Sequence, residues 1–153
     1  MLEPGKKLPK FALPASGART LTQADFAGRK LVVYFYPKDA TPGCTLEAQD
    51  FRDRHAAFSQ AGTSIVGVSR DSAASHDRFC AKQELPFPLL SDPDEALCNA
   101  FGVIRDKNMY GRTVRGIERS TFLFDESGVL RREWRGARVK GHADEVLEAA
   151  RAL

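Results

Sequence analysis

Three cysteines are the residues of this chain best suited to chemistry, and one of them, Cys44, stands at an unusual place. It ends the stretch Thr41-Pro-Gly-Cys44, which follows an apolar run and opens a helical pattern. A free cysteine usually behaves as a small buried hydrophobe. The first turn of a helix, however, favours an anion through its unpaired amides and the positive end of the helix dipole. We therefore expect Cys44 to be a thiolate nucleophile near neutral pH.

The residues before Cys44 carry the signals of a helix start. Thr41 is a good N-cap, and Pro42 suits the first helical position because its fixed φ matches and its missing N–H would have been unpaired anyway. Cys44 then takes the place where a capping box puts a carboxylate. Two roles stay open for Thr41, helix capping and contact with a reactant, and both can hold together. For Cys44 the alternative is that it only heads the buried stripe of its helix.

The other candidate ligands offer no recognisable metal site. The chain has no Cys-x-x-Cys pair, and its three histidines, His55, His76 and His142, are far apart in the sequence. Structural zinc sites use closely spaced cysteine and histidine ligands. We therefore expect an activity that needs neither a metal nor a bound cofactor.

The elements around Cys44 indicate an α/β fold. Residues 31–36 form a continuous apolar run, which is typical of a central strand covered on both faces. The helix expected after it ends at Gly62 and has one buried stripe, formed by Cys44, Ala48, Phe51, His55 and Phe58. A second strand over residues 63–69 and a serine-capped helix over 71–84, which carries Cys80, repeat the pattern.

The rest of the chain completes a mixed sheet. Residues 10–30 predict a small N-terminal hairpin extension, 86–92 a short extended piece, 94–103 a short helix, and 105–116 a charged loop. Residues 120–125 and 129–134 predict a β-hairpin, and 142–153 a closing helix. This order favours a thioredoxin-like fold, with a central mixed β-sheet flanked by helices, in a single domain over residues 1–153.

Composition excludes a membrane protein and leaves the partners open. Hydrophobic residues make up 42% of the chain, and no run approaches the ~18 apolar residues of a membrane span. No apolar run follows the N-terminal lysines, so we expect no secretory signal and a cytoplasmic location, where thiols stay reduced. Between residues 100 and 141, ten lysines and arginines outnumber five acidic residues. That surplus permits an anionic partner such as nucleic acid, although no DNA-binding motif accompanies it.

The pattern Pro37-x-x-x-Thr41-x-x-Cys44 in "YFYPKDATPGCTLEA" resembles the active-site motif of the peroxiredoxins, most closely the bacterioferritin comigratory protein (Q-type) subgroup. The similarity extends over nearly the whole chain and includes "LLSDPDEALCNAFGV" and "GIERSTFLFDESGVL". It implies a thiol peroxidase that reduces hydrogen peroxide and organic hydroperoxides. Cys44 would be the peroxidatic cysteine, and Thr41 and Pro37 would shape its pocket. Arg119, in "ERSTFLFD", would contact the thiolate and the peroxide.

The resemblance also implies how the oxidised intermediate is resolved. Attack on peroxide leaves Cys44 as a sulfenic acid, which another thiol must trap. Many members of the subgroup carry a second cysteine where this chain has Gln49, and others carry it where this chain has Cys80. We therefore expect an intramolecular Cys44–Cys80 disulfide, which thioredoxin or a similar dithiol protein would reduce. Because a disulfide needs Cα atoms about 4.4–6.8 Å apart, at least one helix must unravel locally.

Several alternatives remain open from the sequence. If Cys80 is only a core residue, an external thiol would resolve a one-cysteine peroxidase. A thioredoxin-like disulfide reductase is disfavoured because Thr41 occupies the first cysteine position of a Cys-x-x-Cys pair. We expect Cys98 in the core, and Glu47 is a candidate for the polar shell of the site, although an exposed helical glutamate is commoner. The resemblance further implies a monomer.

Overall fold

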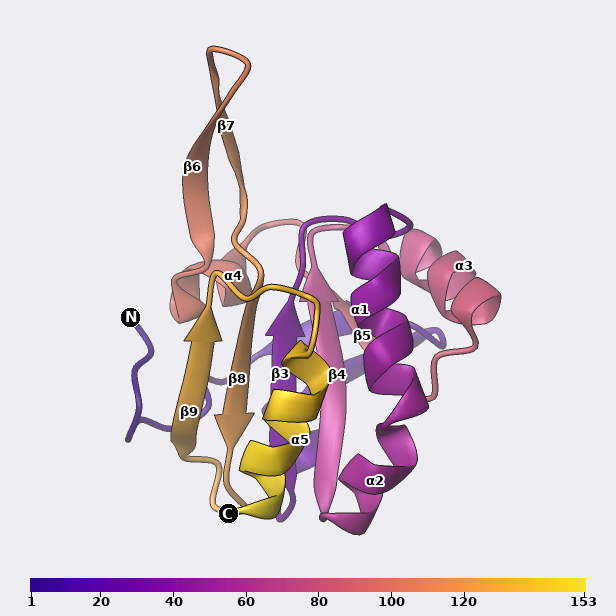
Figure 1. The fold of residues 1–153 in the computed structure, drawn as a ribbon, viewed down its shortest axis with the longest axis vertical. Helices are drawn as coiled ribbons and strands as arrows, with labels where there is room; N and C mark the ends of the chain where they lie inside the picture. The colour runs from indigo at the N-terminus through magenta and orange to yellow at the C-terminus, as the bar shows by residue number, and fades with distance from the viewer.

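The computed structural model describes all residues 1–153 and is built on a seven-stranded mixed sheet (Figure 1). The strand order is β2-β1-β5-β4-β3-β8-β9, and β6 and β7 form a separate two-stranded sheet. The strands are β1 (Ala12–Ala15), β2 (Arg19–Thr22), β3 (Lys30–Phe35), β4 (Thr63–Ser69), β5 (Leu89–Ser91), β6 (Ile104–Met109), β7 (Arg112–Ile117), β8 (Ser120–Phe124) and β9 (Leu130–Arg135). The predicted mixed sheet and its N-terminal hairpin, β1–β2, are confirmed.

Side chains along β3 alternate between two hydrophobic cores, which explains its continuous apolar run. Leu31, Val33 and Phe35 belong to one cluster, whereas Val32 and Tyr34 belong to the other. Within the sheet β3 pairs in parallel with β4 and antiparallel with β8. It is therefore a central strand with both faces covered, as the sequence predicts.

The helices cover both faces of the sheet. They are α1 (Pro42–Asp53), α2 (His55–Gln60), α3 (Ala73–Gln83), α4 (Ala96–Phe101) and α5 (His142–Arg151), with a 3-10 turn, η1, at Gln23–Phe26. Figure 1 shows α1, α2 and α5 in front of the sheet, and α3 joins the same core through Phe79. Buried Cys98 and Phe101 place α4 in the other core, so the expectation for Cys98 is confirmed. A membrane span needs more length and hydropathy than any of these helices has.

The stripe expected on one helix is divided between two helices. α1 ends at Asp53, and Arg54 leaves helical geometry, with φ −105° and ψ 4°, before α2 begins. The Arg54 guanidinium donates to the Asp144 carboxylate on α5 and to the Asp50 carbonyl, which holds the bend against α5. As a result His55 is only half-buried.

Residues 105–116, expected as a loop, form most of a β-hairpin that projects from the body of the protein (Figure 1). β6 and β7 pair antiparallel along their whole length. Tyr110 and Gly111 between them both have positive φ, 54° and 77°, as in the two-residue turns that match the twist of a hairpin. The sequence hides these strands because nearly all their residues are exposed, so no alternation of apolar and polar residues marks them.

Candidate active site

Cys44 lies in the first turn of α1, just beyond the end of β3, and it is 2% exposed. Thr41 is the N-cap, with φ −82° and ψ 154°, and Pro42 is the first helical residue, so the predicted helix start is confirmed. Burial alone would also fit a core cysteine. The groups that contact the sulfur therefore decide whether the position is suited to chemistry.

The Cys44 sulfur contacts the guanidinium of Arg119, which directly precedes β8. Nη2 of Arg119 donates to Sγ of Cys44 at 3.6 Å, across a sequence separation of 75 residues. A Cβ atom on Gly43 would lie 3.2 Å from this Nη2, so a glycine leaves the room that the guanidinium needs. The Arg119 side chain is 17% exposed. It is thus a largely buried cation beside a thiol rather than a surface arginine.

Glu47 is the second group on the same guanidinium, and the structure corrects its expected exposure. Its carboxyl is 2% exposed and accepts from Nη1 of Arg119 at 2.6 Å. Burial raises the pKa of Glu47 to about 7, although the Arg119 charge and hydrogen bond lower it. The other carboxyl oxygen, Oε2, makes no hydrogen bond within the protein. The signal that could have located Glu47 is its spacing of three residues from Cys44, which puts both on one side of a helix.

The Thr41 hydroxyl is directed away from the helix that it precedes. It donates to the Lys38 carbonyl at 2.8 Å and makes no capping hydrogen bond. The first amides of a helix have no intrahelical acceptor, so those of Gly43 and Cys44 stay available to a reactant. Of the two roles open for Thr41, capping by its side chain is therefore not the one the structure shows.

Pro37 is half-buried at the point where the chain leaves β3. Together with Lys38 it lines one wall of a cleft of about 260 Å³, and the other wall is the β6–β7 hairpin. We call this the hairpin cleft. A proline fixes its own φ and lacks an N–H donor, so the turn at Pro37 is stiff and offers an apolar surface to the cleft.

Cys80 lies on α3, half-buried, against the same hydrophobic core as Cys44. All three cysteines are free, and burial raises the pKa of the Cys80 thiol. Tyr34 belongs to the same core cluster as both thiols. Burial, and next the neighbouring Glu47 carboxyl, raise the pKa of Tyr34 well above the usual value. The structure thus gathers the two cysteines around one core but does not join them.

A buried hydrogen-bond network, absent from the sequence analysis, connects the segments that carry the two thiols. Asp39, in the loop before α1, accepts from Tyr36, from Ser75 and, at 2.7 Å, from Nδ1 of His76. Nε2 of the same histidine faces the Leu90 carbonyl at 2.9 Å. Burial on its own raises the pKa of Asp39, but the bonds from His76 and Tyr36 outweigh it and the pKa lies below its ordinary value. Both ring nitrogens of His76 are thus taken up by protein oxygens, the Asp39 carboxylate on one side and the Leu90 carbonyl on the other.

Asp39, Asp71 and His76 place potential metal ligand atoms within 4.8 Å of one another. Their polar atoms already have protein partners, because Asp71 accepts from the Asp39 amide and the Ser69 hydroxyl, and the two ring nitrogens of His76 face the Asp39 carboxylate and the Leu90 carbonyl. The cluster is therefore a hydrogen-bonded brace between the Cys44 loop and α3. The sequence contains these three residues, but it does not indicate that the fold brings them together.

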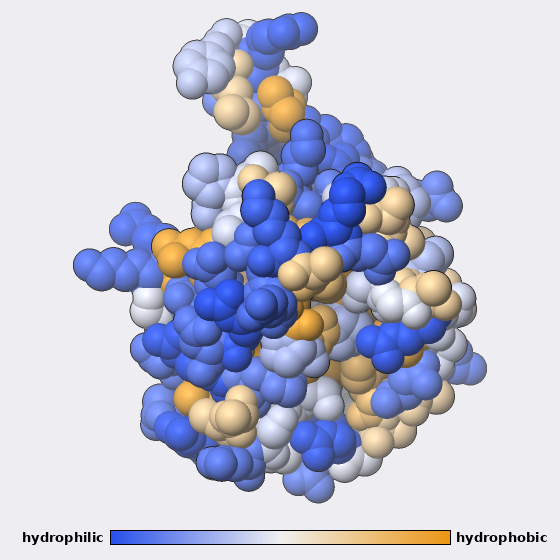
Figure 2. Space-filling view, turned by 90° about the vertical axis from the view of Figure 1, so that its right-hand side faces the viewer, coloured by the Kyte–Doolittle hydropathy of each residue, from blue (hydrophilic) through white to orange (hydrophobic).

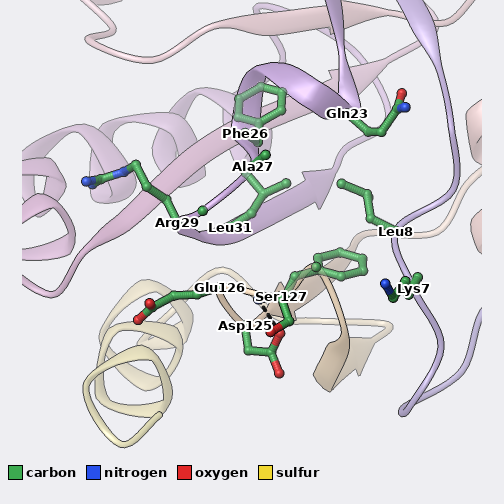
Figure 3. Close-up of a pocket in the computed structure, with 13 residues that line it drawn as sticks. Lys7, Leu8, Gln23, Phe26, Ala27, Arg29, Leu31, Asp125, Glu126 and Ser127 are labelled. Carbon is green, nitrogen blue, oxygen red and sulfur yellow. Dashed lines mark hydrogen bonds between the residues drawn. The ribbon is translucent and has the colours of Figure 1, made fainter.

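A cavity of about 190 Å³ lies at the opposite end of the sheet from Cys44, near the start of β3 and the turn after β8 (Figure 3). Apolar Leu8, Phe26 and Leu31 line it, and charged side chains of both signs border it: Lys7, Arg29, Asp125 and Glu126. None of the residues predicted for the site contributes to this cavity.

Comparison with known proteins agrees with this geometry. Residues 4–133 match the AhpC/TSA family. A relative, Peroxiredoxin Bcp of Xanthomonas campestris pv. campestris, is 57% identical over 144 residues, which cover 93% of this chain and 90% of the relative. Peroxiredoxin Bcp of Escherichia coli is 39% identical over 146 residues, which cover 95% of this chain and 94% of the relative.

Solved structures show the same fold. The bacterioferritin comigratory protein of Xanthomonas campestris, studied for its alkyl peroxide reduction activity, superposes with a TM-score of 0.89 at 55% identity, covering 93% of this chain and 90% of that one. A cysteine-to-serine mutant of PrxQ from Xylella fastidiosa gives a TM-score of 0.94 at 45% identity, covering 99% and 97%. The expected thioredoxin-like architecture is confirmed by these likenesses.

Replacing Glu47 by Gln should change how stability depends on pH. The pKa of Glu47 is about 7 in the folded protein and about 4.3 in an unfolded chain. Its favourable contribution is therefore complete below about pH 4.3 and is lost as the pH rises through about 7. We expect wild-type stability to fall relative to Glu47→Gln by about 3 kcal/mol across this window, measured by urea unfolding. A difference between the two proteins that does not vary with pH would contradict the assignment.

Proposed function

The chain belongs to the AhpC/TSA family and is a peroxiredoxin, and from this membership we propose a thiol peroxidase in which Cys44 attacks hydrogen peroxide or an organic hydroperoxide. The observation that carries the proposal is the Arg119 guanidinium on the buried Cys44 sulfur at a helix N-terminus. The reaction as proposed uses no cofactor, because the thiolate itself supplies the two electrons.

In the proposed step the Cys44 thiolate attacks one oxygen of ROOH. A sulfur–oxygen bond forms, the O–O bond breaks, and its electron pair leaves with the RO⁻ group, which takes up a proton to become an alcohol or water. Cys44 is oxidised by two electrons to a sulfenic acid. Negative charge moves from sulfur to oxygen, and the fixed charge and forked donors of Arg119 suit both positions. The free amides of Gly43 and Cys44 add donors on the helix side.

Thr41 has a directional role in this proposal. Its own hydroxyl hydrogen is committed to the Lys38 carbonyl, so towards a reactant the oxygen can only accept. A hydroperoxide has one O–H group to donate. We assign Thr41 to hold the peroxide by accepting this hydrogen, and Pro37 to limit the mouth of the pocket.

Cys80 is the proposed resolving residue. Its thiol attacks the sulfenic acid, a Cys44–Cys80 disulfide forms, and water leaves with the hydroxyl oxygen and the thiol proton. The position of both cysteines around one core supports this choice over a one-cysteine peroxidase resolved by an external thiol. Their placement on different helices, both thiols free, also means that α1 or α3 must open for the bond to form.

The Asp39–His76 brace opposes that opening. His76 lies one helical turn before Cys80, and Asp39 lies in the loop that leads to Cys44, so the brace ties both thiol-bearing segments to the folded arrangement. Its bonds are fully buried, where a charge-assisted hydrogen bond contributes about 1.5–3 kcal/mol. We assign His76 as a positioning residue that sets how often the site opens.

The partner and location form the finer part of the proposal. We propose thioredoxin or a similar dithiol protein as the reductant, a monomeric enzyme, and a cytoplasmic location, where such dithiols are kept reduced. The family resemblance supports the reductant and the monomer. The structure supports the need for a reductant through its two proposed redox thiols.

Intact mass after one equivalent of hydrogen peroxide tests the two cysteine roles. We expect the reduced wild type to lose two hydrogens, because Cys44 and Cys80 form a disulfide. Cys80→Ser should gain one oxygen, and Cys44→Ser should stay unchanged. Cys98→Ser is the control and should behave as the wild type. An internal disulfide in Cys80→Ser would show that Cys80 does not resolve the intermediate.

Arg119→Gln should slow the first step, because it removes the charge that stabilises the departing oxygen. Loss of one such donor lowers the rate by about 10²- to 10³-fold, which stopped-flow reaction of the reduced enzyme with peroxide would measure. Arg29→Gln, at the opposite end of the sheet, is the matched control and should react at the wild-type rate. Equal rates for both variants would remove Arg119 from the mechanism.

His76→Asn should accelerate disulfide formation by about tenfold, the equivalent of about 1.4 kcal/mol from the lost brace. Rapid quench and mass spectrometry would follow conversion of the sulfenic acid to the disulfide. The rate of the peroxide step at Cys44 should stay within about twofold of wild type. Val146→Ala removes core packing on α5 and serves as the control for general loss of stability. If both variants speed resolution equally, the brace has no specific role.

A further inference from the structure

The β6–β7 hairpin has more exposed apolar surface than its role in the fold explains. It pairs with no other strand, so its two outer edges are open, and Figure 1 shows it projecting past the end of the sheet. An isolated two-stranded hairpin is only marginally stable in water. Here the base is anchored by buried Ile117 and by Glu95, which binds both Arg115 of the hairpin and Arg70 of the body. The β6–β7 hairpin is thus fixed at its base, and its tip is exposed to solvent.

Exposed large apolar side chains gather at this end of the molecule. Six such side chains are exposed in the whole chain, and two of them belong to the terminal residues Met1 and Leu153. The other four are Leu46 (50% exposed), Met109 (48%), Tyr110 (98%) and Val114 (44%). Leu46 lies on α1 two residues after Cys44, and the others lie on the hairpin. Figure 2 shows apolar atoms on the hairpin above the body, among hydrophilic side chains.

The face of the hairpin that borders the hairpin cleft is both apolar and cationic. The strand register sets Lys107 opposite Val114 and Met109 opposite Arg112, all on one face because side chains alternate along a strand. No carboxylate lines the cleft, and across it lies Lys38. The charged groups of Lys107, Arg112 and Lys38 form no ion pair within the protein. These three free cations beside apolar groups fit a partner with an acidic and apolar surface.

We propose that this face of the hairpin, with Lys38, is the docking surface for an acidic dithiol protein that reduces the oxidised enzyme. The inference rests on the proposed function, in which each turnover leaves a Cys44–Cys80 disulfide. A thiolate of the partner attacks one sulfur of that disulfide and forms a mixed disulfide. The partner's second thiol then displaces it, which returns both cysteines as thiols and leaves the disulfide in the partner.

The position of the surface favours this partner over others. The hairpin stands at the end of the sheet where Cys44 lies, and Pro37, in the segment between β3 and α1, forms a wall of the hairpin cleft. A second copy of the chain would bring like charges together, which is unfavourable. Nucleic acid would be attracted by the cations, but it makes no use of the exposed Met109 and Val114 or of the nearness to Cys44.

Charge reversal on the hairpin separates docking from chemistry. The double variant Lys107→Glu/Arg112→Glu would be assayed for hydrogen peroxide reduction with dithiothreitol, and with a bacterial thioredoxin kept reduced by its reductase and NADPH. We expect kcat/KM for thioredoxin to fall about tenfold at low ionic strength, because exposed charges mainly act on association. The dithiothreitol-supported rate should equal that of wild type. At high salt the wild-type rate with thioredoxin should fall towards that of the variant.

The matched control is Lys7→Glu/Arg29→Glu, which makes the same change in net charge at the cavity of Figure 3. Wild-type kcat/KM for thioredoxin in the hairpin variant, or an equal loss in the control, would overturn the docking surface. Binding of a labelled DNA duplex that the hairpin variant loses, with its thioredoxin kinetics unchanged, would assign the surface to nucleic acid instead. If the wild type does not reduce peroxide with dithiothreitol, the proposed peroxidase activity is itself contradicted. This outcome is distinguishable from a failure of the docking surface alone.

Discussion

One guanidinium, that of Arg119, serves two buried acidic groups, and the rest of the site is arranged around this constraint. Cys44 and Glu47 lie one helical turn apart on α1, and both contact it. The Arg119 charge and hydrogen bond offset the desolvation of the Glu47 carboxyl only in part, so burial still raises the pKa of Glu47 to about 7. Gly43 provides the space for the guanidinium, and β8 fixes the backbone from which it extends. The absence of a side chain at Gly43 therefore allows the charge of Arg119 to reach the Cys44 sulfur.

Local signals in the sequence predict the segments of this protein well. The buried strand, the helix start at Thr41 and the Ser72 cap, whose hydroxyl accepts from the Ser75 amide, all have the predicted form. Local signals do not predict which distant segments of the chain contact one another. Arg119 reaches Cys44 across 75 residues, and without the family resemblance nothing in its neighbourhood distinguishes it from other arginines. The hairpin was missed for a related reason, since its strands bury no face and so leave no periodic pattern.

Stability and turnover place opposite demands on the segment between β3 and α1. The two cores hold the sheet rigidly, and the Asp39–His76 pair extends that rigidity to the loop and helix that carry Cys44 and Cys80. The sequence predicts the two redox thiols and the opening of at least one helix. It does not predict the brace, because a buried acid–histidine contact depends on how α3 packs against the loop. In the proposed enzyme, the segments that would rearrange to form the disulfide are thus held together by a buried hydrogen bond.

The orientation of the Thr41 hydroxyl has a chemical consequence. Because its hydrogen is donated to the Lys38 carbonyl, the oxygen can act only as a hydrogen-bond acceptor towards an incoming molecule. Dialkyl peroxides, whose weak O–O bond is capped by carbon at both ends, bring lone pairs of their own and would meet repulsion there. This one hydrogen bond would then favour hydroperoxides, which carry an O–H group, over dialkyl peroxides, independently of how well the carbon chains fit.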